Sequence, residues 1–118
     1  MQRVALLAAL AAALILVVPV HATAPPVGAL PKGPVTTIAT AKGSLVSIAL
    51  PSRAGKSWRL ARAVNSKVLV EVTEANVGSN VVVIYRATGR GSVKVAYALT
   101  RGETAKAFAS ATFNVRVS

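Results

Sequence analysis

The side chains that could carry out acid–base or metal chemistry are scarce in this 118-residue sequence. It contains no Cys, no Asp, three Glu and a single His at position 21. A thiolate nucleophile, a disulfide and a sulfur-bound metal are therefore excluded. Glu71 and Glu74 are three positions apart, and on a regular strand that spacing places them on opposite faces. We therefore do not expect them to act as a general acid–base pair.

No other residue pattern indicates a catalytic site. Ser and Thr are common, but none stands beside a base that would activate it as a nucleophile. The segment Gly89-Arg90-Gly91 lies between two apolar runs and is typical of a hairpin turn. The alternative, a phosphate-binding loop, lacks the helix that must follow it. We predict a protein that is not an enzyme and that uses no cofactor and no metal.

Positive charge is the main chemical feature of the chain, which has 14 Lys and Arg against 3 acidic residues and a net charge of +11. Two interpretations stay open. The charges solvate strand faces and edges, or they bind an anionic partner such as an acidic protein surface, lipid head groups or an acidic envelope polymer. Nucleic acid is not expected, because no aromatic side chains interleave with the basic ones. The basic residues fall into two groups: Arg53, Lys56, Arg59 and Arg62, then Arg86, Arg90, Lys94, Arg101 and Lys106.

The N-terminus has the three-part pattern of a secretory signal peptide. Met1–Arg3 is basic, the run from Val4 to Val20 is apolar, and small residues follow His21. We predict a signal peptide over residues 1–22, cleaved after Ala22. The alternative is an uncleaved membrane anchor. The protein is thus expected to be exported, either periplasmic or secreted, and its Ala-, Val- and Arg-rich composition is typical of bacteria.

The next residues divide into a Pro- and Gly-rich lead-in over 23–34 and a single domain over 35–118. From Val35 onward, apolar residues recur at every second position, as in half-buried strands. A helix is the alternative over 57–64, where Ala, Arg and Leu are frequent. The predicted architecture is all-β: an immunoglobulin-like β-sandwich of about seven strands. Besides a strand near Val35, the expected strands are Ser44–Leu50, Trp58–Val64, Lys67–Thr73, Val81–Ala87, Ser92–Leu99 and Ala107–Val117.

Three segments resemble the chagasin family of cysteine-peptidase inhibitors. In that family a strand leads into an Asn-Pro-Thr-Thr-Gly loop and a Trp follows its Gly; here Gly55 and Trp58 keep the Gly-x-x-Trp spacing. The run from Val81 to Tyr97 matches the second family signature, through Ala87-Thr88-Gly89. The last strand lies where the family places its last strand. Ser52-Arg53-Ala54-Gly55 replaces the first loop motif, and Leu99-Thr100-Arg101 replaces the Arg-Pro-Trp segment of the third loop.

The resemblance implies a monomeric inhibitor that inserts three loops into the cleft of a papain-like cysteine peptidase. Those loops are centred on Ser52–Ser57, Asn76–Asn80 and Thr100–Lys106. The alternative function is a non-inhibitory, immunoglobulin-like envelope module that binds an anionic surface or a partner protein. The residues expected to contact the partner are Arg53, Ala54, Gly55, Lys56, Trp58, Gly78, Thr100 and Arg101.

Several of these residues have a structural interpretation as well. Trp58 is expected in the core of the sandwich, with the binding surface as the alternative. Tyr85 and Tyr97 are expected at the edge of the core, each with its hydroxyl bonded to the backbone. Gly55 and Gly89 are expected in turns that require a positive φ.

Overall fold

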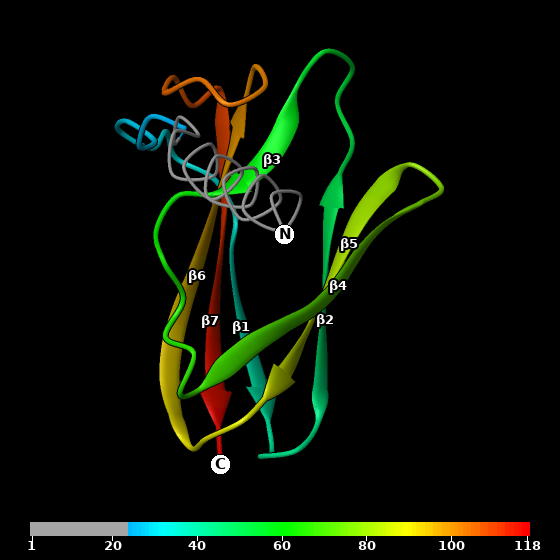
Figure 1. Cartoon of the computed structure of the whole chain (residues 1–118), viewed down its shortest axis with the longest axis vertical. Helices are drawn as coiled ribbons and strands as arrows, with labels where there is room; N and C mark the ends of the chain where they lie inside the picture. The colour runs from blue at the N-terminus through cyan, green and yellow to red at the C-terminus, as the bar shows by residue number, and fades with distance from the viewer. Residues whose placement is uncertain (1–23) are drawn as a thin grey trace, which may run out of the picture.

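Seven strands form two sheets that pack face to face (Figure 1). A computed structural model describes residues 24–118; the predicted signal peptide lies outside the described residues. One sheet has the order β1-β7-β6-β3 and the other the order β2-β5-β4. The predicted immunoglobulin-like sandwich is confirmed. No helix in residues 24–118 is long and apolar enough to cross a membrane. The strands are β1 (Val35–Thr40), β2 (Leu45–Pro51), β3 (Ser57–Leu60), β4 (Leu69–Val77), β5 (Asn80–Ala87), β6 (Gly91–Thr100) and β7 (Ala109–Val117).

The alternating apolar pattern explains the core. On β2, Val46, Ile48 and Leu50 are buried while the residues between them are exposed, as the sequence predicts. Val83 on β5 and Val115 on β7 meet them from the two sheets. Full burial of one such aliphatic side chain contributes roughly 1.5–3 kcal/mol. A chain without disulfides is therefore held together by this apolar layer.

Two tyrosine hydroxyls join the sheets inside the core. Tyr85 on β5 and Tyr97 on β6 lie with their oxygens 2.5 Å apart, and both residues are buried. The sequence prediction of two separate backbone partners is therefore wrong. Burial raises the pKa of both phenols, and the carboxylates of Glu71 and Glu74 add to the rise.

Two predicted strands have different bounds. The strand expected over Trp58–Val64 ends at Leu60, because the chain bends at Ala61 and crosses to the other sheet, where β4 begins. The strand expected over Lys67–Thr73 instead continues to Val77. The turn to β5 is therefore shorter than the predicted Asn76–Asn80 loop and contains only Gly78 and Ser79.

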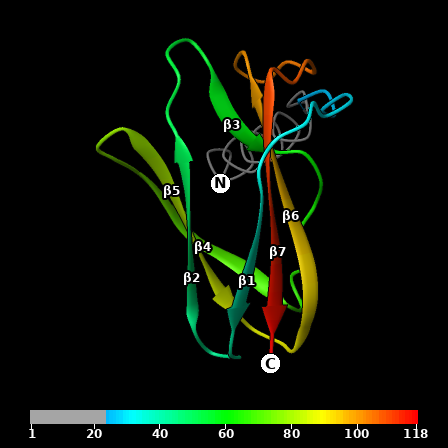
Figure 2. The ribbon, with the colours of Figure 1, turned by 180° about the vertical axis from the view of Figure 1, so that it is seen from behind.

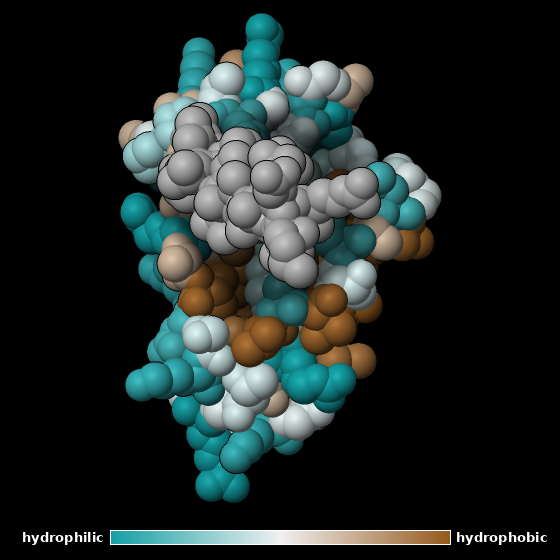
Figure 3. All heavy atoms as spheres, viewed as in Figure 1, coloured by the Kyte–Doolittle hydropathy of each residue, from teal (hydrophilic) through white to brown (hydrophobic). Residues whose placement is uncertain are grey.

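The strand β4 is an edge strand, and beyond Leu69 all its residues are exposed. Together with β5 it forms a hairpin that projects from the sandwich (Figure 1). Apolar surface lies along β4 where it crosses the front of the molecule (Figure 3). The ladder with β5 is irregular between Glu71 and Thr73, so Val72 is an extra residue in a β-bulge. A bulge and nearby charges are features that keep edge strands from pairing with other chains.

The outer face of β6 is covered more than the sequence predicts. Alternation along the run Ser92–Leu99 places Ala96 and Ala98 on the outer face of the sheet, yet both are buried. Residues 24–34 run beside this sheet: Ser110 Oγ donates to the Pro31 carbonyl at 2.6 Å, and the Arg59 guanidinium donates to the Pro25 carbonyl. Since Ala98 pairs with both Arg59 and Ser110, it lies beneath these two anchors. The lead-in therefore acts as a strap on the four-stranded sheet (Figure 2).

Candidate functional site

Three connections lie at one end of the sandwich, which we call the loop end (Figure 1). They are the β2–β3 loop over residues 52–56, the β4–β5 turn at Gly78-Ser79 and the β6–β7 loop over residues 101–108. Because the strands that they join run antiparallel to their sheet neighbours, the three connections emerge together. The three sequence segments predicted to contact a partner therefore belong to one surface, contributed by both sheets.

The β2–β3 loop is tightly folded and tied to the β4–β5 turn. The Lys56 amide donates to the Arg53 carbonyl at 3.2 Å, and Gly55 has φ +73°. A side chain rarely adopts that conformation, so the predicted need for Gly at this position is confirmed. The Ser52 amide donates to the Ser79 carbonyl at 2.9 Å. This bond joins two of the three connections directly.

Gly89, the second glycine expected to have a positive φ, is required for a different reason, a close approach of the backbone. It has no positive φ; instead, a Cβ built there would lie 2.1 Å from the Lys67 carbonyl oxygen. The backbone of the β5–β6 turn thus passes too close to the β3–β4 connection for any side chain. This turn lies at the end of the sandwich opposite the loop end.

Trp58 serves the core and the surface together. Its indole packs partly buried against the core, and Nε1 donates to the Pro51 carbonyl at 2.8 Å. The same side chain lines a groove of about 460 Å³ at the loop end. The expected contact of Trp58 with the core is confirmed, its part in a binding surface stays a prediction, and the hydrogen bond holds the start of β3 against the end of β2.

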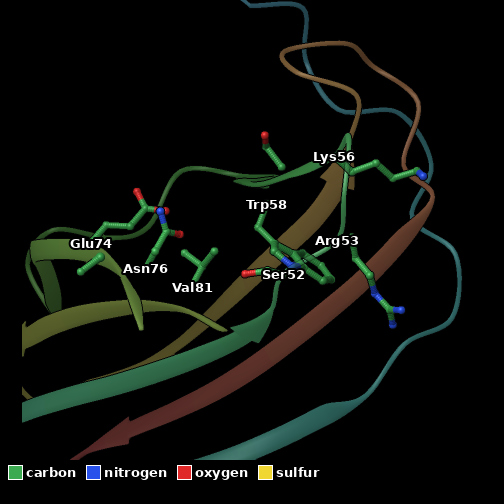
Figure 4. A pocket seen from close by; sticks show the side chains of 9 residues that line it. Ser52, Arg53, Lys56, Trp58, Glu74, Asn76 and Val81 are labelled. Carbon is green, nitrogen blue, oxygen red and sulfur yellow. The ribbon is translucent and has the colours of Figure 1, made fainter. Parts of the chain in front are cut away.

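The groove lies between the β2–β3 loop and the outer part of the β4–β5 hairpin (Figure 4). Ser52 and Trp58 form one side; Glu74, Asn76 and Val81 form the other. Arg53 and Lys56 also border it, but their side chains point away from Glu74 (Figure 4). The groove thus has an acidic wall on β4 and an aromatic wall on β3.

The β-bulge gives the two glutamates of β4 a different orientation from the predicted one. Glu71 pairs with Tyr85 and Glu74 pairs with Val83, and these partners both point into the core. Directly paired residues share a face of a sheet. Glu71 and Glu74 therefore lie on the same face, because Val72 is an extra residue between them. The prediction of opposite faces is wrong for this strand.

A second feature of the loop end is the aromatic ring of Phe108, which is 39% exposed. Lys56 Nζ and Lys106 Nζ each lie 5.0 Å from the ring centroid, and Arg101 Cζ lies 5.4 Å from it. These distances are typical of cation–π contacts. We call Phe108 with these three basic residues the Phe108 cation cluster. It connects the β2–β3 loop to the β6–β7 loop.

Sequence reasoning missed Phe108. Phe108 falls within the expected strand Ala107–Val117, but the alternating pattern of that strand assigns it neither to the core nor to a contact surface. The ring stays at the surface because β7 begins only at Ala109, while the Phe108 amide still donates to the Leu99 carbonyl at 2.8 Å. The usable signal was a large aromatic residue directly after a basic loop. Phe108 thus places an aromatic side chain at the end of the β6–β7 loop.

The remaining predicted contact residues divide into exposed and buried ones. Arg53, Ala54, Gly55, Gly78 and Arg101 are exposed at the loop end. Thr100 is fully buried, and its Oγ1 donates to the Gly102 carbonyl at 2.6 Å. It shapes the β6–β7 loop and offers no surface to a partner.

The two predicted groups of basic residues are rearranged in space. Arg53 and Lys56 from the first group lie near Arg101 and Lys106 from the second, around Phe108. Arg59 is bound by the lead-in, and Arg86 reaches the Gly43 carbonyl, at 3.5 Å, at the opposite end. Nothing within residues 24–118 groups three His, Asp or Glu side chains as a metal site would.

The fold has counterparts among solved structures, although no family model and no curated protein sequence matches the chain. The cysteine protease inhibitor EhICP2 from Entamoeba histolytica matches with a TM-score of 0.56 at 12% identity, over 75% of this chain and 99% of that one. Amebosin matches with a TM-score of 0.50 at 20% identity, over 75% of this chain and 100% of that one. At these identities the likeness concerns the fold, and the chagasin-like fold is confirmed.

Proposed function

We propose that this protein is an exported, reversible inhibitor of cysteine peptidases of the papain-like type. The observation that carries the proposal is the gathering of three connections from both sheets at the loop end. Such an end can enter a cleft and exclude substrate without any chemistry by the inhibitor. The likeness to EhICP2, whose name states cysteine protease inhibition, supports this choice over other uses of a sandwich.

Each connection has a distinct part in the proposed inhibitor. The β2–β3 loop is the central one, because Gly55 lets its backbone approach a cleft wall closely and Arg53 extends from it. The β4–β5 turn, held by the Ser52–Ser79 bond, supports it from one side. The β6–β7 loop supports it from the other, with Arg101 and Phe108 as the contact side chains. Aromatic and Arg side chains are common interface anchors.

The test is a panel of peptidases assayed with the purified protein after near-UV circular dichroism has shown that it is folded. The panel contains papain-like cysteine enzymes, one serine enzyme and one metallo-enzyme. We expect sub-micromolar inhibition confined to the cysteine enzymes. Inhibitor binding should persist when the peptidase thiol is blocked by a small alkyl group, because no bond to it is needed. A folded sample that inhibits none of the enzymes would contradict the proposal.

A specific observation also favours the second candidate function, a basic module that binds an anionic partner without inhibition. The Phe108 cation cluster gathers positive charge at one place rather than spreading it over strand faces. Salt separates the two functions. Affinity that rests on exposed charges is largely lost at high ionic strength, whereas a cleft inhibitor loses only part.

A further inference from the structure

The Phe108 cation cluster concentrates charge in an unusually small region. Its three cationic groups all lie within 5.4 Å of one ring centroid. Any two of them are therefore at most about 10 Å apart, which is about the Debye length at an ionic strength of 0.1 M. The potential here favours a negatively charged ligand.

The shape of the surface beside the cluster indicates which type of negatively charged ligand can bind there. Arg53 and Lys56 line a shallow hollow of about 330 Å³ with Leu99, Phe108 and Ala109. The floor is apolar and the rim is basic, so the hollow fits one or two side chains better than an extended polymer. Arg53 borders this hollow and Arg101 lies over the Phe108 ring, and each guanidinium group by itself presents paired donors that match a carboxylate. Because the aromatic ring already holds the cations close together, little ordering is needed when the ligand binds.

We propose that the Phe108 cation cluster is a binding site for Asp or Glu side chains of a protein partner. The identification of that partner as the target peptidase rests on the proposed function. The target then has an acidic rim next to its cleft, on the side that the β6–β7 loop covers. The acidic wall of the groove, formed by Glu74, lies across the β2–β3 loop from the cluster. The loop end thus has a basic side and an acidic side. This arrangement selects the orientation in which a partner binds as well as the sign of its charge.

The first experiment measures the binding of a capped hexaglutamate peptide to the full chain by fluorescence anisotropy. The test variant is Lys56→Glu/Lys106→Glu. The matched control is Arg90→Glu/Lys94→Glu, which has the same net charge but alters exposed residues outside the loop end. We expect about a tenfold loss of affinity in the test variant and less than about a threefold loss in the control. Equal losses would mean that net charge alone attracts the peptide, which would overturn the proposal.

A second variant removes the ring's contribution without any change in charge. In Phe108→Leu the apolar volume is nearly kept, but the π face that holds the three cations is lost. We expect hexaglutamate affinity to fall about two- to fivefold, as for the loss of a surface cation–π contact. Unchanged affinity would remove the aromatic ring from the site and contradict its proposed part in ordering the cations.

The origin of the ligand is tested with two competing polyanions, heparin and vesicles of phosphatidylglycerol. If either binds more tightly than hexaglutamate and loses that affinity in Lys56→Glu/Lys106→Glu, the ligand is a polymer or a membrane, and the proposal of a protein partner fails. Weaker binding, or binding that both double variants reduce equally, supports the protein partner.

Failure of this inference can be told apart from failure of the proposed function. Inhibition of a peptidase that is unchanged in Lys56→Glu/Lys106→Glu would leave the inhibitor in place and overturn the acidic-rim inference. Site-specific hexaglutamate binding by a protein that inhibits no peptidase would keep the carboxylate site but reject the peptidase as its partner.

Discussion

The hydroxyl oxygens of Tyr85 and Tyr97 lie 2.5 Å apart in the interface between the two sheets. Tyr85 belongs to β5 and Tyr97 to β6, so this bond links the sheet that supplies the β4–β5 turn to the sheet that supplies the β6–β7 loop. The Tyr97 and Phe113 rings also lie in a T-shaped arrangement, with their centroids 6.4 Å apart. The polar pair is thus fixed within an aromatic and aliphatic core, and it joins the two sheets there.

We predict that the protein loses stability in alkaline solution because of this pair. Burial raises the pKa of both phenols; their mutual hydrogen bond adds to the rise at Tyr97 and opposes it at Tyr85. An unfolded tyrosine has a pKa of about 10. Because the pKa of each phenol is higher in the folded state, the contribution of the pair to stability is fully present below about pH 10. This contribution is lost as the pH rises further. The chain has only two tyrosines, so phenolate absorbance reports them alone.

The measurement is a pH titration of phenolate absorbance together with circular dichroism. We expect both tyrosines to ionise in one step that coincides with unfolding. Lysines titrate in the same range, so Tyr85→Phe/Tyr97→Phe serves as the control and should show a smaller alkaline loss of stability. Ionisation near pH 10 in a protein that stays folded would contradict the burial of the pair.

Replacing one tyrosine of the pair should lower the free energy of unfolding by more than half of the loss caused by replacing both. Tyr97→Phe leaves the Tyr85 hydroxyl buried without its partner, at a cost of about 1–3 kcal/mol, and Tyr85→Phe does the reverse. The double variant removes both polar groups together, so its loss should be smaller than the sum of the two. Urea unfolding followed by the fluorescence of Trp58, the single tryptophan, measures all three. Additive losses would mean that each hydroxyl has another partner.

The strand pattern was predictable because it depends on local alternation. Val46, Ile48 and Leu50 are one example: each position of β2 is buried or exposed as the sequence indicates. The bulge at Val72 was not predictable in this way, since the residues on either side still alternate plausibly. An extra residue reverses the facing of everything after it, and only the pairing with β5 reveals it.

The candidate site was predictable as a set of loops and not as a set of contacts. Resemblance placed Arg53, Gly55 and Arg101 in loops that do meet at one end of the fold. It gave no means of seeing that Thr100 is buried or that Phe108 is exposed, because both depend on where β6 ends and β7 begins. The Tyr85–Tyr97 bond joins different sheets, so it also follows from packing and not from local sequence.

Two glycine replacements should separate stability from inhibition. In Gly89→Ala the new methyl group would lie 2.1 Å from the Lys67 carbonyl oxygen, so the backbone must move, at about 1–3 kcal/mol. The turn lies away from the loop end, so the fraction that stays folded should inhibit normally. In Gly55→Ala nothing lies within 4 Å of the new Cβ, and the cost of about 1–2 kcal/mol comes from φ alone.

Inhibition constants and urea midpoints measured on both glycine variants test this contrast. Gly55→Ala should weaken inhibition by more than its loss of stability explains, because relief of the strained φ reshapes the central loop. Equal inhibition by Gly55→Ala and the parent protein would exclude the tight Arg53–Lys56 turn from the contact surface.

Charge reversal at the loop end should weaken binding to the target. We expect Arg53→Glu/Arg101→Glu to raise the inhibition constant about tenfold, mainly through a slower association rate. Arg90→Glu/Arg116→Glu makes the same change in net charge at exposed positions outside the three connections and should alter the constant much less. Stopped-flow association at two salt concentrations measures the effect. Unchanged constants in Arg53→Glu/Arg101→Glu would remove both arginines from the mechanism.

The first and last strands of the domain lie side by side in parallel, with Val35 paired to Thr112 and Thr40 to Val117. In the four-stranded sheet, β7 separates β1 from β6. The strand β1 therefore cannot join its sheet until residues 109–117 are available. Pairing between segments so distant in sequence is slow, because a long loop must close before any contact forms. Completion of the fold is thus tied to the arrival of β7, and a polypeptide still emerging from a ribosome would remain open until that strand was free.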